Sequence, residues 1–222
     1  MVDNWRGRWS ALAVFSIVMW PDIHHPVTAI RCNKGMVRAA NIHTRLLTSL
    51  FLVAAENVDH RVMRVVHHWN APRWVRLWMV CATRGGDGWL WYALGGSLLL
   101  GGGTGGRLAV AAAALAAGAG IVVFLTLKKA TRRRRPREFE AHCWATLLPP
   151  DQFSFPSGHT ITAFAVVVPV MLALPQLSAS LLICALSVAA SRILLGMHFL
   201  TDVLAGIALG TLLGLFAFHL LA

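Results

Sequence analysis

The stretch from Leu108 to Leu127, LAVAAAALAAGAGIVVFLTL, decides the fold class of this 222-residue chain. It carries no charge over its whole length and ends on Lys128 and Lys129. About 20 apolar residues are what an α-helix needs to cross a bilayer. The whole chain is 57% hydrophobic and only 13% charged, whereas about 25% charged residues are typical of soluble domains. We therefore expect an all-α, integral-membrane protein.

Other uncharged stretches predict further membrane-spanning helices on both sides of this one. Gly88–Gly105 comes before it and opens with tryptophan and tyrosine side chains, which favour a membrane interface. Thr160–Ala190 is too long for one crossing, and Pro175 near its middle predicts two helices joined by a tight turn. Val203–Ala222 forms a last span. The pattern predicts a helical bundle of about six core helices with at least five membrane spans.

The first part of the chain has weaker patterns. We expect residues 1–41 to be an N-terminal extension and residues 42–222 to be the membrane-embedded domain. Within the extension, Ala11–Trp20 is a short apolar run after two arginines, which resembles a signal segment. A disordered or interfacial extension and a true start at Met36 are the alternatives.

Two segments before the first clear span mix charged and apolar residues. Asn57–Trp69 and Pro72–Thr83 combine arginine and histidine with valine, methionine, leucine and tryptophan at roughly helical spacing. This spacing predicts amphipathic helices that lie along the membrane interface. Short helices that pack against the bundle are the alternative.

The charge of the chain is one-sided, with 20 lysines and arginines against 9 acidic residues and a net charge of +11. Such an excess favours anionic partners, which include membrane lipids, phosphorylated lipid substrates and nucleic acid. The basic cluster Lys128–Arg137 is flanked by apolar helices and not by a soluble domain. We therefore expect lipid partners and no nucleic acid.

Three polar clusters interrupt the apolar segments, where charged groups are costly and therefore indicate function. They are Lys128 with Arg135-Pro136, then Phe155-Pro156-Ser157-Gly158-His159, and then Ser191-Arg192 with His198 and Asp202. The first follows one predicted span and the second begins the next. The turn at Pro175 then returns the chain, so that the third cluster reaches the same side of the membrane as the other two.

The residue types in these clusters are those that bind a phosphate. Lys128, Arg135 and Arg192 supply three cations, and arginine can hold phosphate oxygens in a bidentate fork. Ser157 is a favourable N-cap for a helix that begins at Gly158, and the N–H groups of a helix start bind anions.

Two histidines complete the predicted site. His198 and Asp202 are four residues apart and share a helical face, where the carboxylate can orient the imidazole as a nucleophile. His159 is placed to protonate the leaving oxygen. Arg192 and His198 would diverge on one uninterrupted helix, so a turn is expected near Gly196.

The same clusters argue against a metal centre. They bring one carboxylate and two histidines beside three cations, and these cations would repel a divalent ion. We expect no metal site and no cofactor.

These three clusters resemble the signature of the type 2 phosphatidic acid phosphatase superfamily, which includes vanadium haloperoxidases and bacterial acid phosphatases. The resemblance covers roughly residues 42–222, and the segment 84–88, Arg-Gly-Gly-Asp-Gly, is also similar to membrane relatives. The chain departs where members often have Arg-Pro-Arg-Pro, because Glu138 follows Arg135-Pro136-Arg137 here.

The resemblance implies a six-helix bundle that releases phosphate without a metal. It implies His198 as nucleophile, Asp202 as its partner and His159 as general acid. The phosphate would be held by Lys128, Arg135, Ser157, Gly158 and Arg192.

The expected reaction is hydrolysis of a phosphate or pyrophosphate monoester of a lipid. Phosphatidic acid, phosphatidylglycerol phosphate, undecaprenyl pyrophosphate and lipid A are the substrate types that the resemblance implies. A lipid phosphotransferase that uses the same histidine is one alternative, and a catalytically silent membrane scaffold that binds anionic lipid is another.

The expected location is the cell (inner) membrane, with several crossings. The basic residues favour a cytoplasmic active site by the positive-inside rule. The resemblance implies the periplasmic or extracellular side, and part of the basic cluster is catalytic, so we favour the latter.

Overall fold

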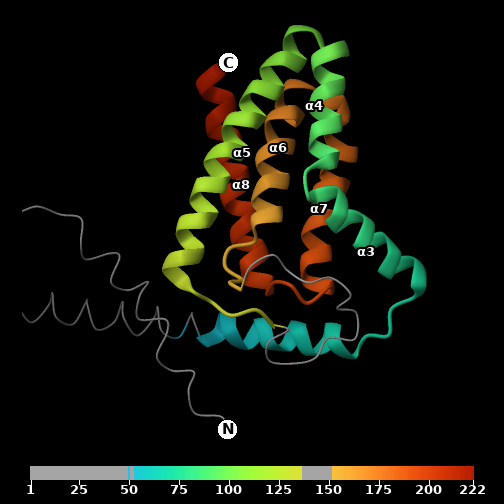
Figure 1. Cartoon of the computed structure of the whole chain (residues 1–222), viewed down its shortest axis with the longest axis vertical. Helices are drawn as coiled ribbons and strands as arrows, with labels where there is room; N and C mark the ends of the chain where they lie inside the picture. Colours follow the sequence, from blue (N-terminus) through green and yellow to red (C-terminus); the bar gives the residue numbers. More distant parts are fainter. Residues whose placement is uncertain (1–49, 51–52, 137–151) are drawn as a thin grey trace, which may run out of the picture. The chain divides into compact units, whose positions relative to one another are not determined.

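A computed structural model of the chain describes residues 50, 53–136 and 152–222. The predicted extension, residues 1–41, and its boundary with the membrane domain lie outside the described residues. Residues His60–Ala222 form one compact unit. A helix over 53–68 precedes the named elements, which are α3 (Arg73–Gly86), α4 (Trp89–Gly101), α5 (Gly103–Thr131), α6 (Gly158–Ala173), the 3-10 turn η2 (Pro175–Leu177), α7 (Ser178–Leu194) and α8 (Leu200–Leu221) (Figure 1). The predicted all-α bundle is confirmed, and the described residues contain α3 to α8 in addition to the helix over 53–68.

Each of the five predicted spans corresponds to an apolar helix. Among the described residues, α5, η2 with α7, and α8 are long and apolar enough to cross a membrane. The helices α4 and α6 are apolar but shorter. The segment Gly88–Gly105 does not form one continuous helix, because α4 ends at Gly101 and α5 begins at Gly103, which has a positive φ of 58°.

The centre of the unit is formed by α5, α6 and α8, which run side by side (Figure 1). Glycines let α8 approach α6 closely: a Cβ at Gly210 would lie 2.5 Å from the backbone oxygen of Ile161. A Cβ at Gly206, one turn earlier, would lie 2.9 Å from Cβ of Thr160. Small residues at four-residue spacing are a common way for membrane helices to pack. This packing fixes the start of α6 against the start of α8.

The helix α3 packs on α7 and does not stand apart from the bundle. Its buried residues are Met79, Thr83 and Gly86, whereas Trp74 and Trp78 on its other side are exposed. The segment predicted as Pro72–Thr83 therefore forms a helix packed against the bundle, which was the second of the two interpretations.

Two predicted turns are confirmed. At the first, α6 ends at Ala173 and Pro175 opens the 3-10 turn that leads into α7. At the second, α7 ends at Leu194, and Gly196 adopts a positive φ of 65° before α8 begins at Leu200. The left-handed conformation is favourable for glycine and costly for most other residues. The second turn is therefore where His198 separates from the helix that carries Arg192.

Candidate active site

A cavity of about 730 Å³ lies among α4, α5 and α6 and contains most of the predicted site residues. At one end it is lined by residues of all three polar clusters: Lys128, Arg135, Gly158, His159, Arg192 and His198. The structure therefore brings these six residues together, as the span order predicted. The other two predicted site residues, Ser157 and Asp202, are buried and are not among the residues that line the cavity.

The His198 imidazole is almost fully buried, with 1% of the residue exposed, and its two nitrogens have different partners. Nδ1 lies 2.6 Å from the backbone oxygen of Ser154. A carbonyl oxygen only accepts hydrogen bonds, so Nδ1 carries the proton and Nε2 keeps its lone pair. Burial, together with the positive charges of Arg192 and Arg135, lowers the pKa of His198 to about 3. The ring is therefore neutral at physiological pH, with Nε2 available as a nucleophile.

Asp202 lies close to His198, but its strongest contacts are elsewhere. Its Oδ2 is 3.7 Å from His198 Nδ1, which is longer than a hydrogen bond. Oδ2 accepts from the backbone N–H of Phe199 at 2.8 Å, and Oδ1 accepts from Arg133 at 2.6 Å. The Ser154 carbonyl, at 2.6 Å, is nearer to Nδ1 than this carboxylate, and both lie on the Nδ1 side of the imidazole. Asp202 caps its own helix and pairs with Arg133, and it contributes negative charge behind the ring.

The three predicted cations reach the cavity from three elements. Arg135 donates from Nη1 to the Met197 carbonyl at 2.7 Å, and the same nitrogen lies 3.3 Å from His198 Nε2. Arg192, near the end of α7, donates from Nη1 to the hydroxyl of Thr83 on α3. Lys128, near the end of α5, lies over the Phe124 ring. Convergent cationic donors beside a nucleophilic nitrogen form a site suited to a phosphate group.

The second cluster provides the start of α6, which begins at Gly158 as predicted. Ser157 occupies the N-cap position, but its side chain makes no capping hydrogen bond. The reason is local: the Thr160 hydroxyl donates to Ser157 Oγ at 2.9 Å, and the Ser157 N–H donates to the Asp202 carbonyl at 3.1 Å. Gly158 itself lines the cavity, so the N-terminal end of α6 faces the cations. First-turn N–H groups of a helix lack intrahelical partners and attract anions.

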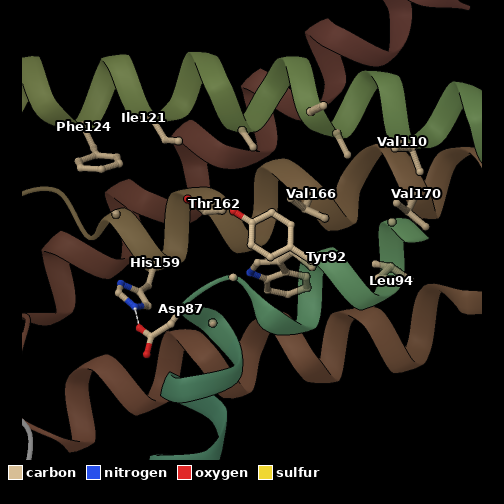
Figure 2. Close-up of a pocket in the computed structure, with 18 of the residues that line it drawn as sticks. Asp87, Tyr92, Leu94, Val110, Ile121, Phe124, His159, Thr162, Val166 and Val170 are labelled. Atoms are coloured by element: carbon tan, nitrogen blue, oxygen red, sulfur yellow. Dashed lines mark hydrogen bonds and ion pairs between the residues drawn. The ribbon is translucent and has the colours of Figure 1, made fainter. Parts of the chain in front are cut away.

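His159 lines the cavity one residue further along α6, and its Nε2 lies 2.7 Å from Oδ1 of Asp87 (Figure 2). Asp87 belongs to the turn between α3 and α4, 72 residues away in the sequence. The imidazole therefore has a carboxylate partner on one side and shares the cavity with Lys128 and Arg192.

The remainder of the cavity is apolar. Aromatic and aliphatic side chains from α4, α5 and α6 surround it, among them Tyr92, Ile121, Phe124, Val166 and Val170 (Figure 2). From Gly158 to Val170 the lining follows α6 for about 18 Å, at ~1.5 Å per residue. One cavity thus joins a cationic end to an elongated apolar end.

Sequence reasoning missed four residues that support the site. They are Thr83, which binds Arg192, Asp87, which binds His159, Arg133, which binds Asp202, and Ser154, which binds His198 through its carbonyl. Asp87 lies within the noted segment 84–88, and Arg133 within the noted basic cluster. Their partners could not be assigned because each contact joins segments distant in the sequence.

In the part of the chain that the structure describes, no group of three or more histidine, cysteine, aspartate or glutamate side chains is arranged to hold a metal ion. The prediction that no metal is used is left to a direct test.

Residues 107–222 match the sequence model of the PAP2 superfamily. Among solved structures, the chain is similar to a transmembrane PAP2-type phosphatidylglycerolphosphate phosphatase from Bacillus subtilis, with 27% identity, 83% of this chain and 90% of that chain covered, and a TM-score of 0.57. It also shares its fold with Aquifex aeolicus LpxE, at 23% identity and a TM-score of 0.62. That similarity covers 72% of this chain and 93% of the LpxE chain. No curated protein matches the chain by sequence.

Proposed function

Because this chain belongs to the PAP2 superfamily, we propose that it is an integral-membrane phosphatase that removes phosphate from a lipid through a covalent phosphohistidine at His198. The observation that carries this proposal is the cavity that joins a cationic end, where His198 lies, to an elongated apolar end. A phosphorylated lipid has the same two parts. A small soluble phosphate ester would leave the apolar end empty.

The first chemical step transfers phosphate to the enzyme. His198 Nε2 attacks the phosphorus, the bond from phosphorus to the lipid oxygen breaks, and the electron pair goes to that oxygen. His159 gives its proton to the leaving oxygen, and the lipid alcohol or lipid phosphate leaves. Lys128, Arg135, Arg192 and the N-terminal end of α6 stabilise the charge on the phosphoryl oxygens.

The second step returns the enzyme to its starting state. A water molecule attacks the phosphohistidine, and His159 takes a proton from this water. The bond between phosphorus and His198 Nε2 breaks, the electron pair returns to the nitrogen, and orthophosphate leaves. Asp202 and the Ser154 carbonyl keep the ring oriented with its proton on Nδ1 through both steps.

Among lipid phosphates, phosphatidylglycerol phosphate is the first substrate to test. The similarity to a phosphatase of that lipid extends over 90% of its chain at 27% identity. Phosphatidic acid, undecaprenyl pyrophosphate and lipid A complete the panel, because the cationic end can bind any terminal phosphate.

The test is phosphate release from this panel by the purified protein in detergent. Wild type is expected to release phosphate from at least one lipid, in the presence of EDTA and with inhibition by vanadate. His198→Ala should abolish release, whereas His219→Ala, which removes a histidine from the far end of α8, should not. Undiminished release by His198→Ala, or strict dependence on an added metal, would overturn the proposal.

We further propose that the protein resides in the inner membrane and that the active site faces the periplasmic or extracellular side. The exposed Arg132, at the end of α5 near the site, is suited to a test by Arg132→Cys in a cysteine-free background. Labelling by a membrane-impermeant maleimide in intact cells is expected. Labelling only after the cells are opened would place the site on the cytoplasmic side.

A further inference from the structure

The carboxylate of Asp87 is held against His159 by a turn that the sequence builds with glycines. Asp87 is the C-cap of α3, and its N–H contacts the carbonyls of Arg84 and Gly85. Gly88, the next residue, has a φ of 130°, which only glycine adopts readily. The 2.7 Å contact with His159 Nε2 is therefore fixed by backbone conformation as well as by the side chain (Figure 2).

Gly86, the residue before Asp87, brings this turn close to the His159 imidazole. A Cβ at Gly86 would lie 2.9 Å from Cγ1 of Val188 on α7 and 3.4 Å from Cδ2 of His159. A larger residue at this position would push the turn away from both helices. The absence of a side chain at Gly86 thus lets α3 end directly beside the His159 ring.

The charges around His159 make this contact important for proton transfer. Burial of the ring disfavours its protonated form, as do Arg192 on α7 and Lys128 on α5, whereas Asp87 acts in the opposite direction. Arg135 and His198, which also line the cavity, add no negative charge. On α8, Asp202 pairs with Arg133, and on α3 the exposed Arg84 lies 3.8 Å from Asp87 itself. Asp87 is therefore the carboxylate that faces His159 among the described residues.

We propose that Asp87 is a positioning residue that orients His159 and favours its protonated form as the general acid of the reaction. This inference rests on the function proposed above. Asp87 accepts a hydrogen bond from His159 Nε2–H, which leaves Nδ1 as the nitrogen that gives its proton to the leaving oxygen. After that transfer, the neutral ring takes a proton from the attacking water on the same nitrogen. Asp87 stays ionised throughout and touches neither the phosphate nor the lipid.

The test compares two substrates that differ in how much they need an acid. One is an alkyl phosphate, whose leaving oxygen must be protonated, and the other is a nitrophenyl phosphate that carries the same alkyl tail and departs as a stable anion. General acid catalysis contributes about 10²–10⁴-fold. Asp87→Asn is therefore expected to lower kcat by about 10–100-fold with the alkyl phosphate and by less than about 3-fold with the nitrophenyl phosphate.

Two comparisons distinguish positioning from a general structural effect. Arg84→Gln removes the other charged neighbour of Asp87 three residues away and should leave both rates near wild type. Asp87→Glu keeps the carboxylate and should restore part of the loss with the alkyl phosphate. With Asp87→Asn, the basic limb of the pH profile of kcat/KM should move to lower pH, because the protonated ring loses its negative neighbour.

The outcomes separate this inference from the proposed function. Equal losses with the two substrates, or wild-type activity of Asp87→Asn with both, would overturn the role of Asp87 while the phosphatase assignment stands. A wild-type protein that releases phosphate from neither substrate would overturn the proposed function and the inference together. Should Asp87→Asn fail to fold, Asp87→Glu carries the same test, with a smaller selective loss of rate with the alkyl phosphate expected.

Discussion

The two ends of the cavity are built by different means. At the polar end, buried ionisable groups bind partners from distant parts of the chain, such as Arg192 with Thr83 and His198 with the Ser154 carbonyl. At the apolar end, α4 contributes glycines as well as larger side chains, and a Cβ at Gly95 or Gly96 would meet nothing within 4 Å. Substitutions at the polar end should therefore affect the chemistry, whereas those at the apolar end should change which lipid fits.

The largest expected effect is on stability, at the ion pair behind the polar end. Arg133→Gln removes the 2.6 Å partner of Asp202, whose side chain is fully buried. Breaking a buried pair in this way costs about 3–5 kcal/mol, so the thermal unfolding midpoint in detergent should fall clearly. Arg132→Gln, at the exposed neighbouring position, is the control and should leave the midpoint nearly unchanged. Equal midpoints for both variants would show that the Arg133 pair does not stabilise the site.

A matched pair of lysines tests whether the polar end binds the phosphate. Lys128 is buried and lines the cavity, whereas the adjacent Lys129 is exposed and does not. Lys128→Gln should lower kcat/KM by about 10–100-fold, because a cationic partner of the transferring phosphate is lost. Lys129→Gln should stay near wild type in the same phosphate-release assay. Equal effects would mean that these lysines act through the membrane surface and not through the site.

The apolar end is tested by adding side chains where the structure leaves space. Gly96→Leu should lower kcat/KM for long-chain lipids more than for short-chain ones, by about tenfold, since several methylenes at about 0.8 kcal/mol each lose their binding surface. Stability should not fall, because glycine is a poor helix former and the new Cβ meets open space. Gly118→Leu on α5 adds the same side chain outside the cavity and should leave the chain-length preference unchanged. An unchanged preference in Gly96→Leu would remove the apolar end from the substrate site.

A further expected effect, visible only on acidification, is on the stability of the polar end. The pKa of His198 is about 3 in the folded protein and near the ordinary value of 6.5 in the unfolded chain. Between these values the unfolded chain binds the extra proton, so the free energy of unfolding should decrease as the pH falls from 6.5 towards 3. His198→Gln should weaken this dependence in thermal unfolding scans at several pH values. A dependence that is identical in the variant would show that His198 does not contribute to it.

The sequence was most informative where one local rule decides the structure. Uncharged stretches of sufficient length predicted the apolar helices, and Pro175 and Gly196 predicted the turns after α6 and α7. Counting the spans then placed the three polar clusters at one end of the bundle. That count required no knowledge of side-chain contacts.

The sequence was least informative where contacts join distant segments. His198 and Asp202 have the spacing for a direct hydrogen bond, but the loop before α6 places the Ser154 carbonyl on the ring instead. Four consecutive arginines precede Pro136, and nothing in their spacing indicates that Arg133 binds Asp202.

The measurement that tests the central claim most directly is the identity of the phosphorylated residue during turnover. The nitrophenyl phosphate accelerates the first step, so the phosphoenzyme should accumulate and can be quenched in alkali, where phosphohistidine survives. Peptide mapping by mass spectrometry is expected to find the phosphoryl group on His198, and none in His198→Asn. Phosphate on another side chain, or continued turnover with an unmodified His198 and no phosphoenzyme, would contradict the account.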